Sequence, residues 1–410
     1  MVGTAIWNQV RIAREDRFSS LLNPSEFTPY RLKKVEYASS NSSLFTLRAP
    51  RRGSVRWDDG GENDEDTEGE KEDGEGELRE LLREAWKRGV WSVQIKQPQL
   101  QIARSYTPLP PITSTSPPTP PSPSSTTTTT KSTSTSSTAD LPPVKPIANP
   151  SSVSDIPPQE TDLRFYIRQH TSGELSRYLH AIPPNERVFV RGPYLELEIP
   201  EHVEEVVFIA GGTGIAPAMQ IADLMARRER GGKLTVLWAC RMRDECAGGV
   251  SASESGAGVE GGAGSGQHPP SSPSSWRNWL SLTNPSPPPP SSSPRRKSPI
   301  VTSLESLQSR LNAHPTAPTS SLHIEYFVDA ENKMLKPASV LKHLKNGDGS
   351  LKQGTEGARM IVVSGPEGFV NLWAGPKMWA GGKEVQGGVG GWLRGLAGEG
   401  GEKGWRVWKL

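Results

Sequence analysis

Apolar and polar positions alternate along much of the first half of the chain. Leu163, Phe165 and Ile167 are separated by arginine or tyrosine, which is the period of a strand with one buried face. Similar runs predict further strands, a helical segment and one short helix. The strands are expected at 27–37, 43–48, 90–95, 188–190 and 195–199, with an extended continuation over 97–106, and the helical segments at 78–88 and 175–181. This set of about six strands is typical of a small antiparallel β-barrel.

The hydrophobic period changes in the second half. A continuous apolar run over 206–210 leads into Gly211, and the apolar residues after it recur at helical spacing, namely Ala218, Ile221, Ala222 and Met225. This pattern predicts a β-turn-α unit. Further strands at 234–238, 324–328 and 360–363 alternate with helices at 303–313 and 339–344. The alternation predicts a parallel α/β sheet.

Three low-complexity runs interrupt these patterns. They are acidic over 58–77, rich in Pro, Ser and Thr over 109–160, and rich in Gly, Ser and Pro over 247–299. Such compositions cannot bury enough apolar surface to fold, so we expect disordered insertions. The chain is then predicted to hold a β-barrel domain over 25–205, with the first two insertions, and a nucleotide-binding α/β domain over 206–410, with the third.

Charge and cysteine content narrow the classes of function. The acidic run carries 12 of the 45 acidic residues, so the rest of the chain has 46 basic against 33 acidic residues, a balance that suits an anionic cofactor or an acidic partner. No nucleic-acid-binding motif accompanies it, so no nucleic acid is expected. Two cysteines, Cys240 and Cys246, exclude a disulfide scaffold, and no metal site is expected.

Targeting signals are weak. The first twenty residues contain three arginines, but also Glu15 and Asp16, and form an imperfect mitochondrial presequence. No run of 18 apolar residues is present, so no membrane-spanning helix is expected.

Four short motifs carry candidate chemistry. Arg104-Ser105-Tyr106-Thr107 ends a strand and offers a guanidinium for a phosphate, a flat ring and a hydroxyl. Gly173-Glu174-Leu175-Ser176 opens a helix whose amides could bind a diphosphate. Taken singly, the first is equally an exposed edge strand and the second an ordinary glycine turn at a helix start.

The third motif is the most specific. The run 211–217 reads Gly-Gly-Thr-Gly-Ile-Ala-Pro between a buried strand and an amphipathic helix, a context that turns backbone amides toward a pyrophosphate. It departs from the Rossmann pattern because Pro217 stands at the third glycine position. The fourth motif, 364–369, reads Ser-Gly-Pro-Glu-Gly-Phe after a parallel strand, where open α/β sheets bind ligands.

In this order the motifs resemble those of the ferredoxin reductase-type FAD/NAD(P) flavoproteins, and within them the NADH-cytochrome b5 reductase-like group. The resemblance implies an FAD-binding barrel followed by an NAD(P)-binding α/β domain. It further implies that Arg104 holds the FAD diphosphate and that Tyr106 and Thr107, the residues closest to catalysis, lie against the flavin ring. The remaining FAD residues would be Arg168, Gly173, Leu175 and Ser176, and those for the nicotinamide dinucleotide would be Gly212, Thr213, Gly214, Pro217, Gly365, Pro366 and Phe369.

The motif at 27–29, the segment 97–101 and the Gly365–Phe369 turn are most similar to a fungal mitochondrial branch that assists haem attachment to cytochrome c. The resemblance implies hydride transfer from NADH or NADPH to FAD and electron transfer to a haem protein, with peripheral association at the mitochondrial inner membrane; otherwise the protein is cytoplasmic. Ser364 stands where many members of the group have a cysteine. A non-catalytic scaffold that binds protein partners through its insertions is the alternative.

The nucleotide preference and the acceptor stay open. Arg241 and Arg243 follow the strand 234–238 and could meet a 2'-phosphate, or they are solvated surface arginines. Trp408, in a tryptophan-rich and glycine-rich tail, could cover the flavin or pack in the core. The two cysteines are interpreted as a buried thiol and a loop thiol rather than as ligands.

Overall fold

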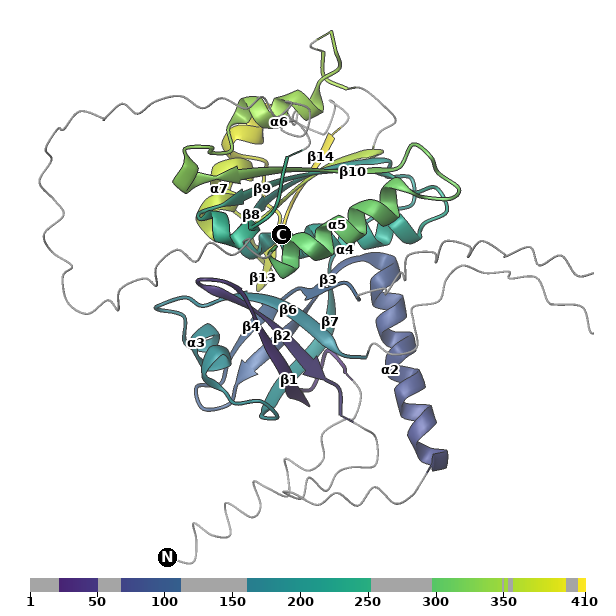
Figure 1. Cartoon of the computed structure of the whole chain (residues 1–410), viewed down its shortest axis with the longest axis vertical. Coiled ribbons are helices and arrows are strands. Elements are labelled where there is room, and N and C mark those ends of the chain that lie inside the picture. Colours follow the sequence, from purple (N-terminus) through teal and green to yellow (C-terminus); the bar gives the residue numbers. More distant parts are fainter. Residues whose placement is uncertain are drawn as a thin grey trace, which may run out of the picture.

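The computed structural model describes residues 22–50, 68–111, 161–251, 297–348, 350–352, 357–395 and 405–410. An antiparallel sheet from the first half of the chain lies below a parallel sheet from the second half (Figure 1). The predicted fold class is confirmed. Half of the first predicted insertion, over 58–67, and most of the other two, over 112–160 and 252–296, fall outside the described residues.

The antiparallel sheet has seven strands in the order β4-β3-β7-β1-β2-β6-β5. The predicted alternation of buried side chains in β6 is confirmed, because Leu163, Phe165 and Ile167 all belong to one buried cluster. The strands are β1 (Thr28–Ser39), β2 (Ser42–Arg48), β3 (Gly89–Gln97), β4 (Ile102–Tyr106), β5 (Pro108–Leu109), β6 (Leu163–Arg168) and β7 (Arg187–Glu198).

The order of the strands shows that this sheet curls into a barrel. β4 and β5 lie at opposite ends of the order, yet only Thr107 separates them along the chain. Because one residue spans only about 3.5 Å, the two ends of the sheet must meet at Thr107. The first candidate motif therefore forms the seam of the barrel.

Two of the predicted barrel strands form one continuous strand. Segments 188–190 and 195–199 belong to the continuous strand β7, which pairs with β3 on both sides of Gly192-Pro193. Proline lacks an amide donor and interrupts regular strand pairing. Gly192 takes a φ of +150°, and the pairing skips residues at bulges, so the strand continues past the proline.

Helix α2 covers one side of the barrel and begins earlier than predicted. It spans Glu68–Arg88, so the second half of the acidic run 58–77 is helical rather than unstructured. Leu78, Leu82, Ala85 and Trp86 recur at helical spacing and are buried in the barrel core. Extending a nucleated helix costs little for glutamate-rich sequence, and acidic residues near a helix N-terminus are favourable.

The second half forms a five-stranded parallel sheet in the order β10-β9-β8-β11-β14. The strands are β8 (Glu205–Gly211), β9 (Lys233–Cys240), β10 (Ser321–Val328), β11 (Arg359–Ser364) and β14 (Trp405–Lys409). Strand β14 was missed in the tryptophan-rich tail, although its side chains alternate. Trp405 and Val407 pack on one face, and Trp408 packs on the other.

Helices cover both faces of this sheet (Figure 1). Helices α4 (Ile215–Arg227) and α5 (Pro299–Asn312) cover the face toward the barrel, and α6 (Pro337–Leu344) and α7 (Glu367–Ala374) cover the other. The short elements are α3 (Glu174–Ala181) beside the barrel, η1 (Gly212–Gly214), η2 (Arg243–Cys246), η3 (Asp329–Glu331), η4 (Gly391–Gly395), β12 (Met378–Ala380) and β13 (Lys383–Val385). Of the helices described, none combines the length and apolar character needed to cross a bilayer.

Side chains form hydrogen bonds with backbone groups of β10 and β14, the two outermost strands of the parallel sheet. The Tyr326 amide of β10 donates to Ser251 Oγ over 3.0 Å. At β14, the Lys409 amide donates to Gln386 Oε1 over 2.7 Å, and Gln386 Nε2 donates to the Lys409 carbonyl over 2.9 Å. The Gln386 amide therefore pairs with β14 as a neighbouring strand would.

The barrel and the parallel sheet are joined through α4. Gln220 on α4 is 1% exposed, and its amide makes three hydrogen bonds to the barrel backbone. The Trp91 amide donates to Gln220 Oε1 over 2.9 Å, while Nε2 donates to the carbonyls of Trp91 and Pro108 over 3.2 and 2.8 Å. Because Pro108 follows Thr107, these bonds fix the barrel seam against the parallel-sheet half.

Candidate cofactor cleft

A cleft of about 500 Å³ opens where the barrel meets the parallel sheet. Volumes of this size are ordinary for small-molecule sites. Twelve of the fourteen predicted site residues line it, and they come from all four motifs. These are Arg104, Tyr106, Thr107, Arg168, Gly173, Leu175, Ser176, Thr213, Gly214, Pro217, Gly365 and Pro366.

The other two predicted residues lie behind the cleft wall. Gly212 is buried in the turn beneath it. Phe369 is half-buried on α7, with its ring against Gly211, where a Cβ atom would come within 2.9 Å of the ring. Both residues therefore shape the loops that line the cleft without facing it.

The barrel seam presents the first motif. Arg104 is exposed on β4, and among the residues that the structure describes its Nη1 donates to the carbonyl of the preceding residue alone, over 3.2 Å. Its guanidinium can therefore turn to an anion. Tyr106 is half-buried against the barrel core, and burial raises its pKa to about 12. The phenol thus stays protonated at neutral pH.

The Gly173–Ser176 turn differs from its predicted use. The Ser176 hydroxyl donates to the Gly173 carbonyl and accepts from the His170 amide, each over 3.1 Å. Since a hydroxyl has one proton, Ser176 has none left to donate to a diphosphate. The N-cap residue of α3 is Gly173, so no N-cap side chain binds the first backbone amides of the helix. These amides remain the donors that this turn offers.

The glycine-rich turn is held from two sides. Gly212 has a φ of +55°, a conformation that glycine adopts without strain, and its carbonyl accepts from Trp238 Nε1 over 2.9 Å. Gly214 has ordinary helical angles. A Cβ atom there would stand 2.5 Å from the Ser364 carbonyl oxygen. Glycine is therefore required at 214 by backbone packing against the Ser364-Gly365 turn.

A buried ion pair below the cleft was missed by sequence reasoning. Arg168 Nη2 contacts Glu245 Oε1. The Glu245 side chain is 0% exposed, and burial raises its pKa despite the nearby Arg168. Arg168 Nε is buried and has no hydrogen-bond partner among the described residues. Arg168 thus has one donor engaged by the protein and another available on the side chain that lines the cleft.

The arginines considered for a 2'-phosphate behave differently. Arg243 is held by Glu331, with Nε to Oε1 at 2.7 Å and Nη2 to Oε2 at 2.5 Å. Arg241 is exposed beside the end of β9. Cys240 and Cys246 are both buried and free, so the expected loop thiol is buried as well. Trp408 packs against the core, whereas Leu410 lines the cleft.

Comparison with known proteins defines the class. Residues 208–248, which hold the end of β8, the glycine-rich turn, α4 and β9, match the family described as the oxidoreductase NAD-binding domain. This part of the parallel-sheet half is therefore similar to that domain.

Two curated fungal proteins are similar to parts of the chain. One is the cytochrome c mitochondrial import factor CYC2 of Saccharomyces cerevisiae, 28% identical over 122 residues, which are 28% of this chain and 24% of that protein. The other is NADH-cytochrome b5 reductase 2 of Phaeosphaeria nodorum, 35% identical over 80 residues, 19% of this chain and 24% of that protein. The predicted family resemblance is confirmed. The matched segments span about a quarter of the length of these relatives.

One solved structure of similar architecture is the cytochrome b5 reductase domain of Ulva prolifera nitrate reductase. It aligns at a TM-score of 0.42 and 13% identity over 86% of this chain and 92% of that one.

Proposed function

We propose that this protein is an FAD-dependent oxidoreductase that takes a hydride from NAD(P)H and passes electrons to a haem protein or another haem acceptor. The observation that carries the proposal is the cleft to which both halves of the chain contribute. The NAD-binding family match and the similarity to an NADH-cytochrome b5 reductase support NAD(P)H and FAD as the cofactors.

The residues of the cleft suit an anionic dinucleotide. Arg104 offers an exposed guanidinium, and Arg168 offers a buried Nε that has no partner in the described part of the chain. We assign both to the FAD diphosphate, together with the first amides of α3. Leu175 is buried beneath that turn and fixes its position.

The seam residues would orient the flavin ring. FAD, when bound, supplies the chemistry of accepting a hydride and releasing single electrons. Tyr106 provides a flat, neutral ring, since its pKa of about 12 keeps it protonated. Thr107 provides a hydroxyl at the junction of β4 and β5. Neither role needs an acid and base pair.

The opposite wall would bind the nicotinamide dinucleotide. Thr213 and Pro217 stand at the start of α4, and Gly365 and Pro366 stand at the end of β11. All four line the cleft across from the seam. Gly212 and Gly214 act through the shape of the turn, and Phe369 acts through the loops that it supports.

The acceptor and the location follow from the relatives. The name of the yeast protein refers to mitochondrial import of cytochrome c, and that of the second relative to cytochrome b5. These names support a cytochrome-type acceptor and a mitochondrial location. We further infer a role in cytochrome c maturation, with peripheral association at the inner membrane.

Anaerobic stopped-flow spectroscopy tests the proposal. The purified chain, reconstituted with FAD, should show a flavin absorbance band that NADH or NADPH bleaches and that oxidised cytochrome c restores. Thr107→Val should retain FAD but slow bleaching by about fivefold, the effect of one lost hydrogen bond of roughly 1 kcal/mol. Thr235→Val, at a half-buried threonine on β9 outside the cleft, should leave the rate unchanged. A chain that binds no FAD would refute the proposal and favour the scaffold.

A further inference from the structure

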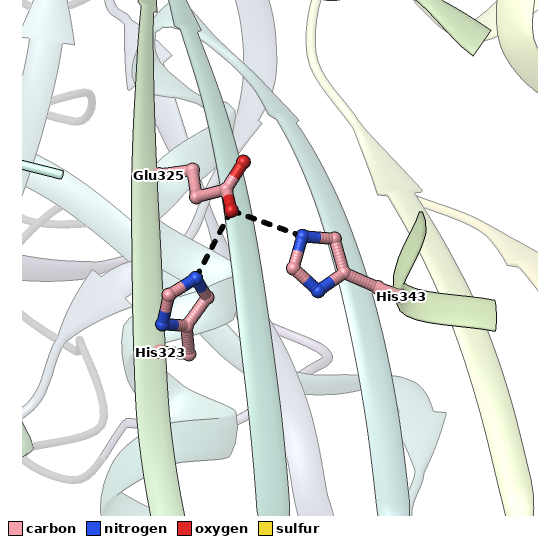
Figure 2. A group of neighbouring side chains, drawn as sticks. All are labelled: His323, Glu325 and His343. Carbon is pink, nitrogen blue, oxygen red and sulfur yellow. Dashed lines mark hydrogen bonds and ion pairs between the residues drawn. The ribbon is translucent and has the colours of Figure 1, made fainter. Parts of the chain in front are cut away.

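Two histidines and a glutamate converge at an outer strand of the parallel sheet (Figure 2). His323 and Glu325 alternate on the face of β10 that α6 covers, and His343 reaches them from α6. His323 Nε2 lies 3.1 Å from Glu325 Oε1, and His343 Nε2 lies 3.2 Å from the same oxygen. None of the three side chains lines the cofactor cleft.

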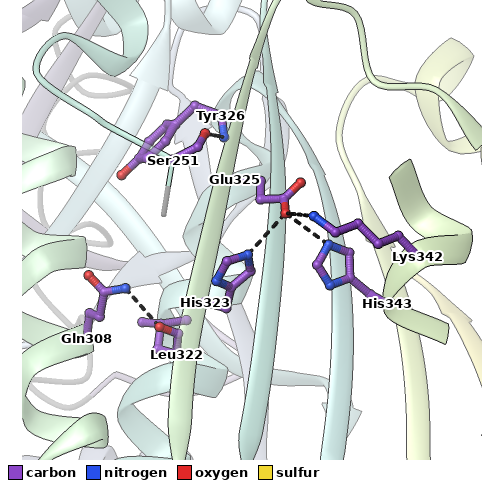
Figure 3. A network of polar contacts seen from close by, with 8 residues as sticks. All are labelled: Ser251, Gln308, Leu322, His323, Glu325, Tyr326, Lys342 and His343. Atoms are coloured by element: carbon purple, nitrogen blue, oxygen red, sulfur yellow. Dashed lines mark hydrogen bonds and ion pairs between the residues drawn. The ribbon is translucent and has the colours of Figure 1, made fainter. Parts of the chain in front are cut away.

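Three polar groups are concentrated on one oxygen of this cluster (Figure 3). Besides the two imidazoles, Lys342 Nζ lies 3.3 Å from Glu325 Oε1. A carboxylate oxygen has two lone pairs, so three donors exceed its ordinary capacity. The Glu325 side chain is only 10% exposed, whereas that of Lys342 is 62% exposed, so the ammonium can leave for water while the carboxylate cannot.

The spacing of the ligand atoms matches a small tetrahedral ion. Zinc bonds of 2.0 to 2.1 Å to nitrogen and oxygen place neighbouring ligand atoms about 3.3 Å apart. The two nitrogen-to-oxygen distances are 3.1 and 3.2 Å, and the three ligand atoms all lie within 4.8 Å of one another. Closing the gap between the imidazoles needs only small side-chain movements.

We propose that His323, Glu325 and His343 bind a divalent transition-metal ion, with zinc as the best fit. Two imidazoles and one carboxylate are donors that zinc accepts, whereas calcium and magnesium prefer sites made of oxygen alone. A water molecule completes the fourth position. The ion ties α6 to β10 and replaces the Lys342 ammonium as the partner of Glu325.

The test is metal titration of the full chain after treatment with a chelator. Calorimetry with Zn²⁺ should give one saturable site, and Co²⁺ should give the visible absorption of a tetrahedral ion. That spectrum should contain no thiolate charge-transfer band, which a site at Cys240 and Cys246 would produce. Lack of saturable binding, or a thiolate band, would overturn the proposal.

Variants distinguish Zn²⁺ binding at these three residues from nonspecific binding of the metal. His343→Ala and Glu325→Gln should each weaken Zn²⁺ binding at least about tenfold, since even indirect partners of a metal contribute that much. Lys342→Met should strengthen binding, because it removes the competing cation. His202→Ala, at an exposed histidine elsewhere, is the matched control and should bind as the parent does. Near-ultraviolet circular dichroism checks that each variant folds, and equal affinity in folded His343→Ala would refute the site.

Discussion

Gln220→Leu should destabilise the contact between the barrel and the parallel sheet. The substitution nearly preserves side-chain volume but removes all three hydrogen bonds between α4 and the barrel backbone. The amide and carbonyl of Trp91 and the carbonyl of Pro108 would then be left without these partners inside a buried interface.

The expected loss follows from the number of bonds. A net value of about 1 kcal/mol for each gives about 3 kcal/mol in total. At roughly 2 to 4 °C per kcal/mol for a folded body of this size, the apparent Tm should fall by about 6 to 12 °C. Flavin reduction by NADH should also slow, because the bond to Pro108 positions the adjacent Thr107.

Thermal unfolding monitored by circular dichroism measures this effect, and Gln308→Leu is the matched control. Gln308 is a half-buried glutamine on α5 whose Nε2 donates to the Leu322 carbonyl over 2.8 Å, within the second half of the chain. Its loss should lower the Tm by about 2 to 4 °C, for one bond of about 1 kcal/mol. Equal shifts in the two variants would refute the reasoning that Gln220 joins the two halves.

Three further predictions concern the cleft. Arg104→Ala should release FAD without changing the far-ultraviolet spectrum, and Arg104→Lys should release it only in part; a flavin-to-protein ratio of one in the alanine variant would contradict this. Burial and the neighbouring Arg168 lower the pKa of His170 below 6.5. Because FAD is an anion, its binding should raise the pKa of His170 again. FAD affinity should therefore increase as the pH falls below 6.5, and this dependence should vanish in His170→Gln. Gly214→Val should lower the Tm, because its Cβ atom meets backbone 2.5 Å away, whereas Gly212→Ala at a φ of +55° should cost only about 1 kcal/mol; equal Tm values for Gly214→Val and the parent would contradict the packing argument.

Sequence patterns predicted the fold class because each half has its own hydrophobic period. The β8-turn-α4 unit was predicted closely, since a buried strand, glycines and an amphipathic helix all follow one another locally. The predicted bounds of helices and strands were less accurate where the local composition is not typical of the element that forms. Helix α2 extends into acidic sequence, and β14 lies in a segment that reads as glycine-rich tail.

Partners that meet only in three dimensions could not be predicted. Glu245 looks like one more loop carboxylate in the sequence, and only the fold brings it to Arg168, 77 positions earlier. Gln220 sits among apolar residues of α4, and its bonds reach 112 and 129 positions back. The metal-binding candidates show the same limit, since alternation relates His323 to Glu325 but no local pattern brings in His343.

The bonds that the Gln386 side chain makes to the backbone of β14 bear on how copies of this protein behave at high concentration. An outermost strand with free amides and carbonyls is a template on which another chain can add a strand, and so a route to aggregation. Gln386 occupies both backbone groups of Lys409, and Ser251 occupies the Tyr326 amide at the opposite side of the sheet. The barrel presents only short outer strands, β4 and β5, which meet at Thr107. The side chains of Gln386 and Ser251 thus hinder the addition of a strand from another molecule. Gln386→Ala would expose the amide and carbonyl of Lys409 to such pairing.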